Sequence, residues 1–480
     1  MITYETIKQL AKDHGITVAD LCALSPKNDP FYTGRPSEVI AAEWFADLWN
    51  QFGYRRGVHL RRVHYQIVSQ NPPVNRPDGS RYENTETCWD YLNEAAKWAR
   101  YLHLVSPAAF VDRRNPEAVV NAYWPKPGDW NYEDPSPGYS VTEWDDTEYE
   151  LPELPELPGL PETLPDLPSF EVFGYQGIQQ AFHVEVWCEK TTMNDVLGPL
   201  CQRYGINLVT GAGELSITAV VDFMRRAQAA ERPARILYVS DFDPAGMGMP
   251  ISVARKIEYF QRNEGFHELD IRLQPVVLTT DQVERFNLPR VPVKDTDLRK
   301  ANFEAAYGQG QVELDALEAL YPGELARIMR ETILQYYDPT LTQRGLEQRD
   351  ALTEALRGEI EAVLEDYTPN LNELTAAYFA LLANFNATRE EFANLIMDFQ
   401  PKIDAYQEQL KAIKDRWREV YGDIQLDLTL KEFDLGELFP LPEPDLPEET
   451  DGSLYDSRRE YLDQLQAYKA QRFNIGAASS

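Results

Sequence analysis

The chain has 480 residues, enough for about three domains of ordinary size. Apolar residues make up 43% of it and aromatic residues 11%, so it can bury several cores and wholesale disorder is excluded. Its 46 Lys and Arg side chains against 78 Asp and Glu give a net charge of −32. An evenly spread charge of that sign would repel nucleic acid rather than attract it.

The charge is not evenly spread. Residues 1–130 hold 15 basic and 15 acidic side chains, whereas 131–170 hold 11 acids and no base, which leaves −21 for 171–480. Within the neutral first part, 51–114 carries ten Arg and Lys against six acids. If the protein contacts nucleic acid, we expect the contact to begin in that stretch.

Targeting and cysteine patterns favour a cytoplasmic protein. The first residues lack the basic and apolar regions of a secretory signal. The apolar run 376–383 is far shorter than the ~20 residues that span a bilayer, so no membrane contact is expected. No CxxC pair occurs, which fits a reducing compartment and argues against a disulfide framework or a zinc site. The four scattered cysteines are Cys22, Cys88, Cys188 and Cys201.

The N-terminal quarter reads as helical. An N-terminal helical segment, 1–50, should contain helices near 4–23 and 36–51, and a DNA-binding winged-helix domain is predicted over 51–130. In that domain we expect a helix over Leu60–Gln70, a turn-rich stretch and a helix over Thr85–Tyr101 with Asn84 or Thr85 as its N-cap. The runs LHLVSP and AVVNAYW would form the wing. Phosphate contacts are expected from Lys97, Arg100, Arg113 and Arg114.

An acidic, proline-rich linker is predicted over 131–170. Within it, 151–168 reads LPELPELPGLPETLPDLP, with prolines at first every third residue. Proline fixes φ and removes a hydrogen-bond donor, so neither helix nor sheet is expected there. A polyproline II strut fits this spacing, either as an acidic spacer or as a docking strip for a partner.

The pattern of apolar residues changes after this linker. The short apolar runs HVEVWC, INLVTG, ARILYVS and IRLQPVVL alternate with helical stretches such as SITAVVDFMRRAQAA and PISVARKIEYFQRN. Strands that alternate with helices indicate βαβ units and a parallel sheet, so 171–338 is predicted to be an α/β domain. The fold class is therefore multidomain, α/β and α.

The region 339–480 is predicted to be acidic and helical. Its apolar residues follow a heptad spacing typical of a coiled coil, either within the chain or between two copies. The residues of this seam are Ile403, Tyr406, Leu410, Ile413, Trp417 and Val420.

Two acidic motifs follow predicted strands. Glu189 and Lys190 close HVEVWCEK, and Asp241 and Asp243 begin DFDPAG directly after ILYVS. Functional crevices of open α/β sheets lie at the carboxyl ends of the strands, and neighbouring strands are about 4.8 Å apart, so these acids should converge. Three carboxylates suit Mg²⁺, with Mn²⁺ as an alternative.

Glycines support this placement. Gly246 would let the following helix begin close to a phosphate, and Gly211 with Gly213 offers a second close approach of the backbone.

The motifs VEVWCEK, VTGAGELS and ILYVSDFDPAG resemble the Toprim domain of topoisomerase VI A subunits and their meiotic transesterase relatives. LRRVHYQIV resembles the helix of that family's winged-helix domain that carries the nucleophilic tyrosine. VELDAL at 312–317 resembles a stretch in bacterial and phage-borne members, some of which serve in plasmid or phage defence. The resemblance covers roughly 55–125 and 180–335.

This resemblance implies Mg²⁺-dependent DNA cleavage. Tyr65 would attack a DNA phosphate and leave a 5′-phosphotyrosyl link, with Arg61 or Arg62 as the assisting cation. Glu189, Asp241 and Asp243 would hold the metal, and Lys190 would assist beside Glu189. In the family the tyrosine and the metal meet across two subunits, so a homodimer on double-stranded DNA is implied. Because no GxxxxGK[ST] motif is present, any ATP chemistry would need a partner subunit.

Several alternatives stay open from the residues. The Toprim acids alone would make a hydrolytic nuclease in which Tyr65 is structural, and a non-catalytic DNA-binding subunit masked by its acidic C-terminal region is a further reading. His64 is either a base or a core residue. Glu313 and Asp315 are either an added metal ligand or a helix N-terminal acid pair.

Overall fold

A computed structural model gives the fold of the chain. It describes residues 2–111, 115–122, 138–142, 159–173, 178–211, 213, 215–392, 400–431, 442–449 and 452–473. These fall into two compact units. Unit 1 comprises 1–128, 180–339 and 444–480, and unit 2 comprises 129–179 and 340–443. No helix among the described residues combines the length and the apolar character needed to cross a bilayer.

The N-terminus of unit 1 is helical but interrupted. The helix expected over 4–23 ends at Gly15, whose φ of 64° places it in the left-handed region that favours glycine. A short 3-10 helix follows, in which the Thr17 side chain caps the amide of Asp20. The elements are α1 (Tyr4–His14), η1 (Val18–Leu21) and η2 (Pro30–Tyr32).

Three helices form the next part of unit 1: α2 (Pro36–Gln51), α3 (Leu60–Val68) and α4 (Glu86–Tyr101). The predicted N-cap of α4 is confirmed, because the Thr85 hydroxyl accepts a hydrogen bond from the Cys88 amide at 3.3 Å. Helices α2 and α4 pack against each other, and their shared core contains Phe45, Trp49 and Leu92.

The expected wing is wrong for the residues that the structure describes. The run 102–107 contains no strand. In the run 118–124, Val119 instead forms an antiparallel bridge with Leu208 on a strand of the α/β sheet, with both backbone hydrogen bonds at 2.8 Å. An edge strand carries unpaired backbone groups, and this segment satisfies them. Residues 123 and 124 lie outside the described ranges.

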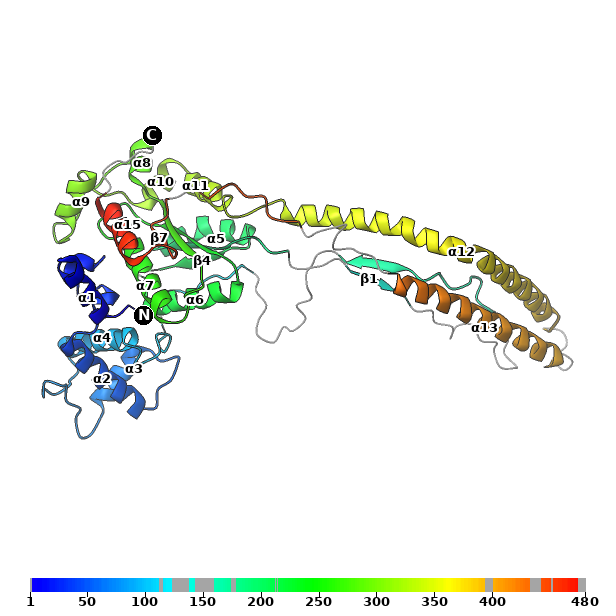
Figure 1. The fold of residues 1–480 in the computed structure, drawn as a ribbon, viewed down its shortest axis with the longest axis horizontal. Coiled ribbons are helices and arrows are strands. Elements are labelled where there is room, and N and C mark those ends of the chain that lie inside the picture. The colour runs from blue at the N-terminus through cyan, green and yellow to red at the C-terminus, as the bar shows by residue number, and fades with distance from the viewer. Residues whose placement is uncertain are drawn as a thin grey trace. The chain divides into compact units, whose positions relative to one another are not determined.

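A five-stranded sheet forms the centre of unit 1 (Figure 1). Its order is β4-β3-β5-β6-β7, and the first four strands are parallel. The four apolar runs named from the sequence supply those parallel strands, as predicted. The strands are β3 (His183–Cys188), β4 (Asn207–Thr210), β5 (Ala234–Val239), β6 (Ile271–Val277) and β7 (Tyr455–Asp456).

Helices cover both faces of this sheet. Ile236 and Tyr238 of β5 lie in one apolar core, shared with α6 and α7, and Leu237 and Val239 lie in the other, shared with α5 and α11. This alternation follows the two-residue period of a strand. The helices of this part are α5 (Asn194–Arg203), α6 (Ile217–Ala230), α7 (Met249–Asn263), α8 (Thr280–Arg285), α9 (Lys300–Tyr307), α10 (Leu314–Leu320) and α11 (Glu324–Ile333), with η3 (Thr191–Met193).

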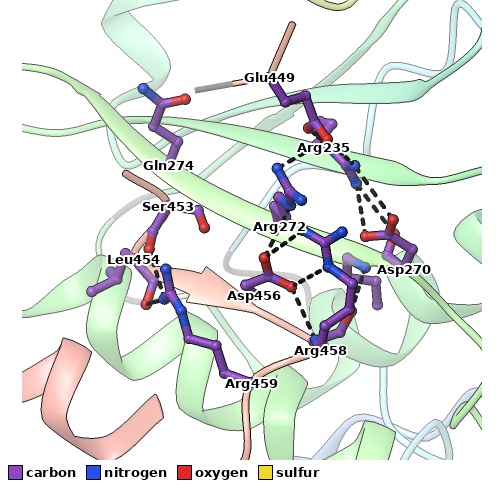
Figure 2. Close-up of polar contacts among 12 residues, drawn as sticks. Arg235, Asp270, Arg272, Gln274, Glu449, Ser453, Leu454, Asp456, Arg458 and Arg459 are labelled. Carbon is purple, nitrogen blue, oxygen red and sulfur yellow. Dashed lines mark hydrogen bonds and ion pairs between the residues drawn. The ribbon is translucent and has the colours of Figure 1, made fainter. Parts of the chain in front are cut away.

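The C-terminal segment returns to unit 1, so 339–480 is not one structural region. Its strand β7 pairs antiparallel with β6. Figure 2 shows the ion pairs that fix it: Glu449 contacts both Arg235 of β5 and Arg272 of β6, at 2.6 and 2.9 Å. Asp456 of β7 contacts Arg272 at 3.1 Å.

The last helix, α15 (Tyr461–Phe473), is anchored by a fully buried ionic cluster. Arg255 of α7 pairs with Asp29 at 3.1 Å and with Glu258 at 2.9 Å, and all three side chains are 0% exposed. The Tyr461 hydroxyl accepts a further hydrogen bond from Arg255 at 2.6 Å. One guanidinium thus joins the N-terminal segment, α7 and α15.

Unit 2 is built on two long helices, α12 (Leu341–Phe392) and α13 (Gln400–Leu430), which lie side by side (Figure 1). The predicted heptad seam on α13 is buried or half-buried against α12, so the coiled coil forms within the chain. A two-stranded antiparallel sheet of β1 (Gly138–Val141) and β2 (Phe170–Phe173) contacts both helices.

The described part of the proline-rich segment, 159–168, packs onto these helices. Leu160 is buried among residues of α12 and α13. The hydroxyls of Tyr378 and Tyr421 donate hydrogen bonds of 2.9 Å to the carbonyls of Pro161 and Pro165. In this part of the linker, therefore, the proline-rich segment lies along the two helices and packs against both. Residues 151–158 lie outside the described ranges.

Candidate functional site

The two acidic motifs meet at the carboxyl ends of adjacent strands. Strands β3 and β5 are paired in parallel with Cys188 opposite Val239, so the residues that follow each strand emerge side by side. The backbone amide of Asp241 donates a hydrogen bond of 2.8 Å to Oε1 of Glu189. Both acids are buried. The expected convergence of Glu189 and Asp241 is therefore present in the structure.

Asp243 shapes the turn that leads into α7. Its Oδ1 accepts hydrogen bonds from the amides of Ala245 and Gly246, at 2.8 and 2.6 Å. A Cβ atom at Gly246 would lie 2.1 Å from the Asp241 carbonyl oxygen and 3.0 Å from Glu189 Oε1. Only glycine therefore lets the turn close over both acids.

The VELDAL segment adds two more acids to this edge. Phe242 and Val312 exchange both backbone hydrogen bonds at 2.9 Å, as an isolated antiparallel bridge. The Leu314 amide donates to Asp241 Oδ1 at 2.7 Å. The residues flanking Leu314, which are Glu313 and Asp315, are thereby held beside Asp241.

Lys190 lies among these acids. Its ammonium is 3.0 Å from Asp241 Oδ2, 3.2 Å from Glu313 Oε2 and 2.9 Å from Asp315 Oδ2. Partial burial lowers its pKa, but the hydrogen bonds to Asp315 and Asp241 outweigh that effect and raise it above the ordinary value. The lysine is therefore charged and balances part of the acidic cluster.

The carboxylates are electrostatically crowded. Burial, together with the charges of Asp241 and Asp243, raises the pKa of Glu189 to about 8. Burial also raises the pKa of Asp241, against the lowering effects of the Leu314 amide and Lys190. Glu189 Oε2 is buried and has no hydrogen-bond partner among the described residues. A buried carboxylate oxygen without a partner is costly unless a cation or a proton satisfies it.

A divalent cation fits this donor set. Carboxylate oxygens are what Mg²⁺ and Mn²⁺ prefer, and Glu189 presents one that is unsatisfied. Among the described residues, no three His, Cys, Asp or Glu side chains are already arranged around a common metal position. Asp241 is bound to the Leu314 amide and to Lys190. Lys190 must therefore move before Asp241 Oδ2 can contact a cation.

The loop after β4 borders the same edge. The Gly211 amide donates to the Cys188 carbonyl at 2.9 Å, and the Gly213 amide donates to the Glu189 carbonyl at 3.2 Å. A Cβ atom at Gly211 would lie 3.0 Å from the Gly213 carbonyl oxygen. Both amides are therefore engaged at the end of β3, and a close approach of this backbone to a phosphate stays a prediction.

Tyr65 lies on the exposed face of α3, where its side chain is 51% accessible. Its hydroxyl makes no hydrogen bond with any residue that the structure describes. Arg61, one turn earlier, stacks over the Trp89 ring at 5.1 Å, and Arg62 is exposed. The described contacts do not bring Tyr65 to the carboxylates within one chain.

His64 is a core residue. It is 4% exposed, and its ring nitrogens are 2.6 Å from the Tyr82 hydroxyl and 3.0 Å from Asn84 Oδ1. Both nitrogens are engaged, so this histidine positions α3 and is not available as a base.

The structure describes two of the four residues that were expected to contact phosphate. Lys97 pairs with Glu94 at 2.7 Å, and Arg100 lies over the Phe110 ring at 4.9 Å, so both are engaged within unit 1. Arg113 and Arg114 lie outside the described residues.

Two exposed arginines that were not among the predicted phosphate contacts precede α3. They are Arg55 and Arg56, in the loop before the helix. The density of Arg around 55–62 was the available signal, but sequence alone did not show which arginines are exposed.

Comparison with known proteins gives no assignment. No protein-family model matches the chain, and no curated protein matches it significantly.

Proposed function

We propose that this protein is a DNA-cleaving enzyme whose reactive centre is the carboxylate cluster at the carboxyl ends of β3 and β5. The observation that carries the proposal is the juxtaposition of Glu189 with Asp241, in which one buried oxygen of Glu189 has no hydrogen-bond partner among the residues that the structure describes. This is the position expected from the resemblance to the Toprim domain of topoisomerase VI A subunits.

In this proposal Glu189, Asp241 and Asp243 hold Mg²⁺ or Mn²⁺. The cation, when bound, supplies positive charge to the DNA phosphate and to its leaving oxygen. The chain's own contribution is positional: the Asp241 amide orients Glu189, and the Ala245 and Gly246 amides orient Asp243. Groups held by backbone hydrogen bonds need little reorganisation when the substrate binds.

Unit 1 is the DNA-binding part in this proposal. Unit 2 contains ten basic and 34 acidic side chains by sequence, which accounts for −24 of the net charge of −32. A polyanion would avoid such a surface. The exposed arginines of α3 and the loop before it offer a phosphate-contacting face in unit 1: Arg55, Arg56, Arg61 and Arg62.

Tyr65 is the proposed nucleophile. Three features support this role: its exposure, the lack of a hydrogen bond from its hydroxyl to any described residue, and the cation one helical turn away at Arg61. In the family that the chain resembles, the tyrosine and the metal come from different subunits, so we propose a homodimer in which each Tyr65 works with the partner's carboxylates. Any strand passage would need an ATPase partner.

The alternative is hydrolysis by the carboxylate centre alone. It is favoured by the lack of any described contact between α3 and the carboxylates, since a water nucleophile requires no second subunit. A role as a non-catalytic DNA-binding subunit is the third reading.

A cleavage assay separates these functions. Supercoiled plasmid would be incubated with the protein and Mg²⁺ or Mn²⁺, and the products would be compared with and without proteinase digestion. Tyr65 as nucleophile predicts protein-linked DNA that Tyr65→Phe abolishes. Cleavage that survives Tyr65→Phe but is lost in Asp241→Ala/Asp243→Ala indicates hydrolysis. No cleavage under any condition would favour the non-catalytic role.

A further inference from the structure

Lys190 occupies an unusual position for a surface lysine. Its ammonium has three donor protons and contacts three carboxylates, those of Asp241, Glu313 and Asp315, all within 3.2 Å. The three acids together carry more negative charge than one ammonium can neutralise. The lysine side chain is only 23% exposed, whereas Glu313 and Asp315 are 53% and 54% exposed. The ammonium is therefore a contact that the three carboxylates share.

The backbone segments that carry the acids are held independently of the lysine. The bridge between Phe242 and Val312 and the hydrogen bond from the Leu314 amide to Asp241 hold both backbone segments. Lysine, by contrast, places its charge on a flexible four-carbon stem. If the ammonium moves away, the backbone therefore still holds Asp241 against the segment that carries Glu313 and Asp315. Asp241 also remains bonded to Glu189, whose Oε2 has no partner among the described residues.

We propose that Lys190 is a tethered cation that occupies a divalent-cation position between Asp241, Glu313 and Asp315, and that the binding of a divalent cation displaces it. This inference rests on the proposed function and names a regulation of the same site. It adds Glu313 and Asp315 to the residues that hold the cation. It also gives Lys190 a role as a positioning residue, because its charge balances the negative charge of the acids before the cation binds.

A permanent ion-pair network is the competing explanation, and the two differ in one respect. A tethered cation competes with the metal, so its removal strengthens metal binding, because a positive charge within a few ångströms of the metal position is lost. A permanent ion-pair network does not compete with the metal. Removal of the lysine charge then lowers the stability of the protein and leaves its metal affinity unchanged.

The test is Mn²⁺ binding to the full-length chain, measured by calorimetry and by the shift of the thermal unfolding temperature. Lys190→Met removes the charge, and Lys190→Gln serves as a second uncharged variant in case the first folds poorly. Lys190→Arg keeps the charge. Lys300→Met is a matched control, since Lys300 is also a half-buried lysine in an ion pair, with Asp295 at 2.6 Å.

We expect Lys190→Met to bind Mn²⁺ at least tenfold more tightly than the wild type, and Lys190→Arg and Lys300→Met to bind it as the wild type does. Without Mn²⁺, Lys190→Met should melt at a lower temperature, and Mn²⁺ should restore much of that loss. Equal affinity of the wild type and both uncharged variants overturns the tethered cation but leaves the proposed function standing. If neither the wild type nor any variant binds Mn²⁺, the cation site itself is wrong, and the proposed function falls with this inference.

Discussion

The amide of Asp241 lies 2.8 Å from Oε1 of Glu189, which ties the end of β5 to the end of β3. The second oxygen of Glu189 is buried and has no hydrogen-bond partner in the described part of the chain. The two acids therefore share a crowded site whose charge must be balanced by a proton, by Lys190 or by a divalent cation.

Glu189 should make the stability of the metal-free protein depend on pH. Its folded-state pKa of about 8 lies above the ordinary value of 4.5 because the site is buried and close to Asp241 and Asp243. The folded state therefore binds more protons than the unfolded state between these values. The free energy of unfolding should fall as pH rises from about 4.5 to about 8, by about 1.4 kcal/mol per pH unit.

Urea denaturation in the presence of a chelator at several pH values measures this slope. Glu189→Gln cannot ionise, so it should lose this part of the pH dependence and be more stable than the wild type near pH 8. Parallel curves for the two proteins across this range would contradict the assignment.

Gly246 should be irreplaceable, whereas Gly248 should not. A Cβ at Gly246 would lie 2.1 Å from the Asp241 carbonyl oxygen, but a Cβ at Gly248 would come no closer than 3.4 Å to its nearest neighbour, the Ala245 carbonyl oxygen. Gly246→Ala should lower the free energy of unfolding by about 1–3 kcal/mol or more and weaken Mn²⁺ binding. Gly248→Ala is the control and should affect both much less. Similar effects of the two substitutions would show that the turn is not held against the acids.

The arginines of α3 should supply phosphate contacts. Arg61→Ala/Arg62→Ala should weaken DNA binding and reduce the slope of log affinity against log salt by about two, because each arginine neutralises one phosphate. Fluorescence anisotropy at several salt concentrations measures this. Lys97→Ala should leave the slope unchanged, because Lys97 is paired with Glu94. If Lys97→Ala lowers the salt slope and Arg61→Ala/Arg62→Ala does not, the phosphate contact lies on α4, as predicted from the sequence.

The buried cluster around Arg255 should be a major source of stability. Arg255→Met would leave Asp29 and Glu258 buried with less positive charge, so unfolding should become easier by about 3–5 kcal/mol. Arg262→Met removes a guanidinium that is 22% exposed and pairs with the same Glu258, and it should cost clearly less. Chemical denaturation compares the two. An equal decrease in the free energy of unfolding in both variants would mean that the burial of an ion pair does not determine its contribution to stability.

Much of the fold could be predicted from local pattern. The strand β3 and the helix α6 were predicted from the apolar run HVEVWC and the helical stretch SITAVVDFMRRAQAA, because these signals lie within the elements themselves. The wing failed for the opposite reason: Val119 pairs with Leu208, far away in sequence, and no local pattern marks an edge strand that needs a partner. The strand β7 has only two residues and escaped notice in the same way.

In the candidate site, too, some contacts could be predicted from local pattern and others could not. Glu189 and Asp241 were expected to meet because both follow strands of one parallel sheet. The contacts of Lys190 with Glu313 and Asp315 were not foreseen, since they depend on a bridge between Phe242 and Val312. The exposure of Tyr65 was equally undetermined, because the apolar spacing of α3 fits either a buried or an exposed tyrosine.

The most direct test of the central claim is cation-dependent cleavage of supercoiled plasmid by the wild type and by Asp243→Asn. This substitution keeps the side-chain oxygen that accepts from the Ala245 and Gly246 amides but removes the charge. We predict that the wild type cleaves only when Mg²⁺ or Mn²⁺ is present and that Asp243→Asn, folded and as stable as the wild type, does not cleave. Cleavage by Asp243→Asn at the wild-type rate, or cleavage by the wild type in the presence of a chelator, would contradict the account.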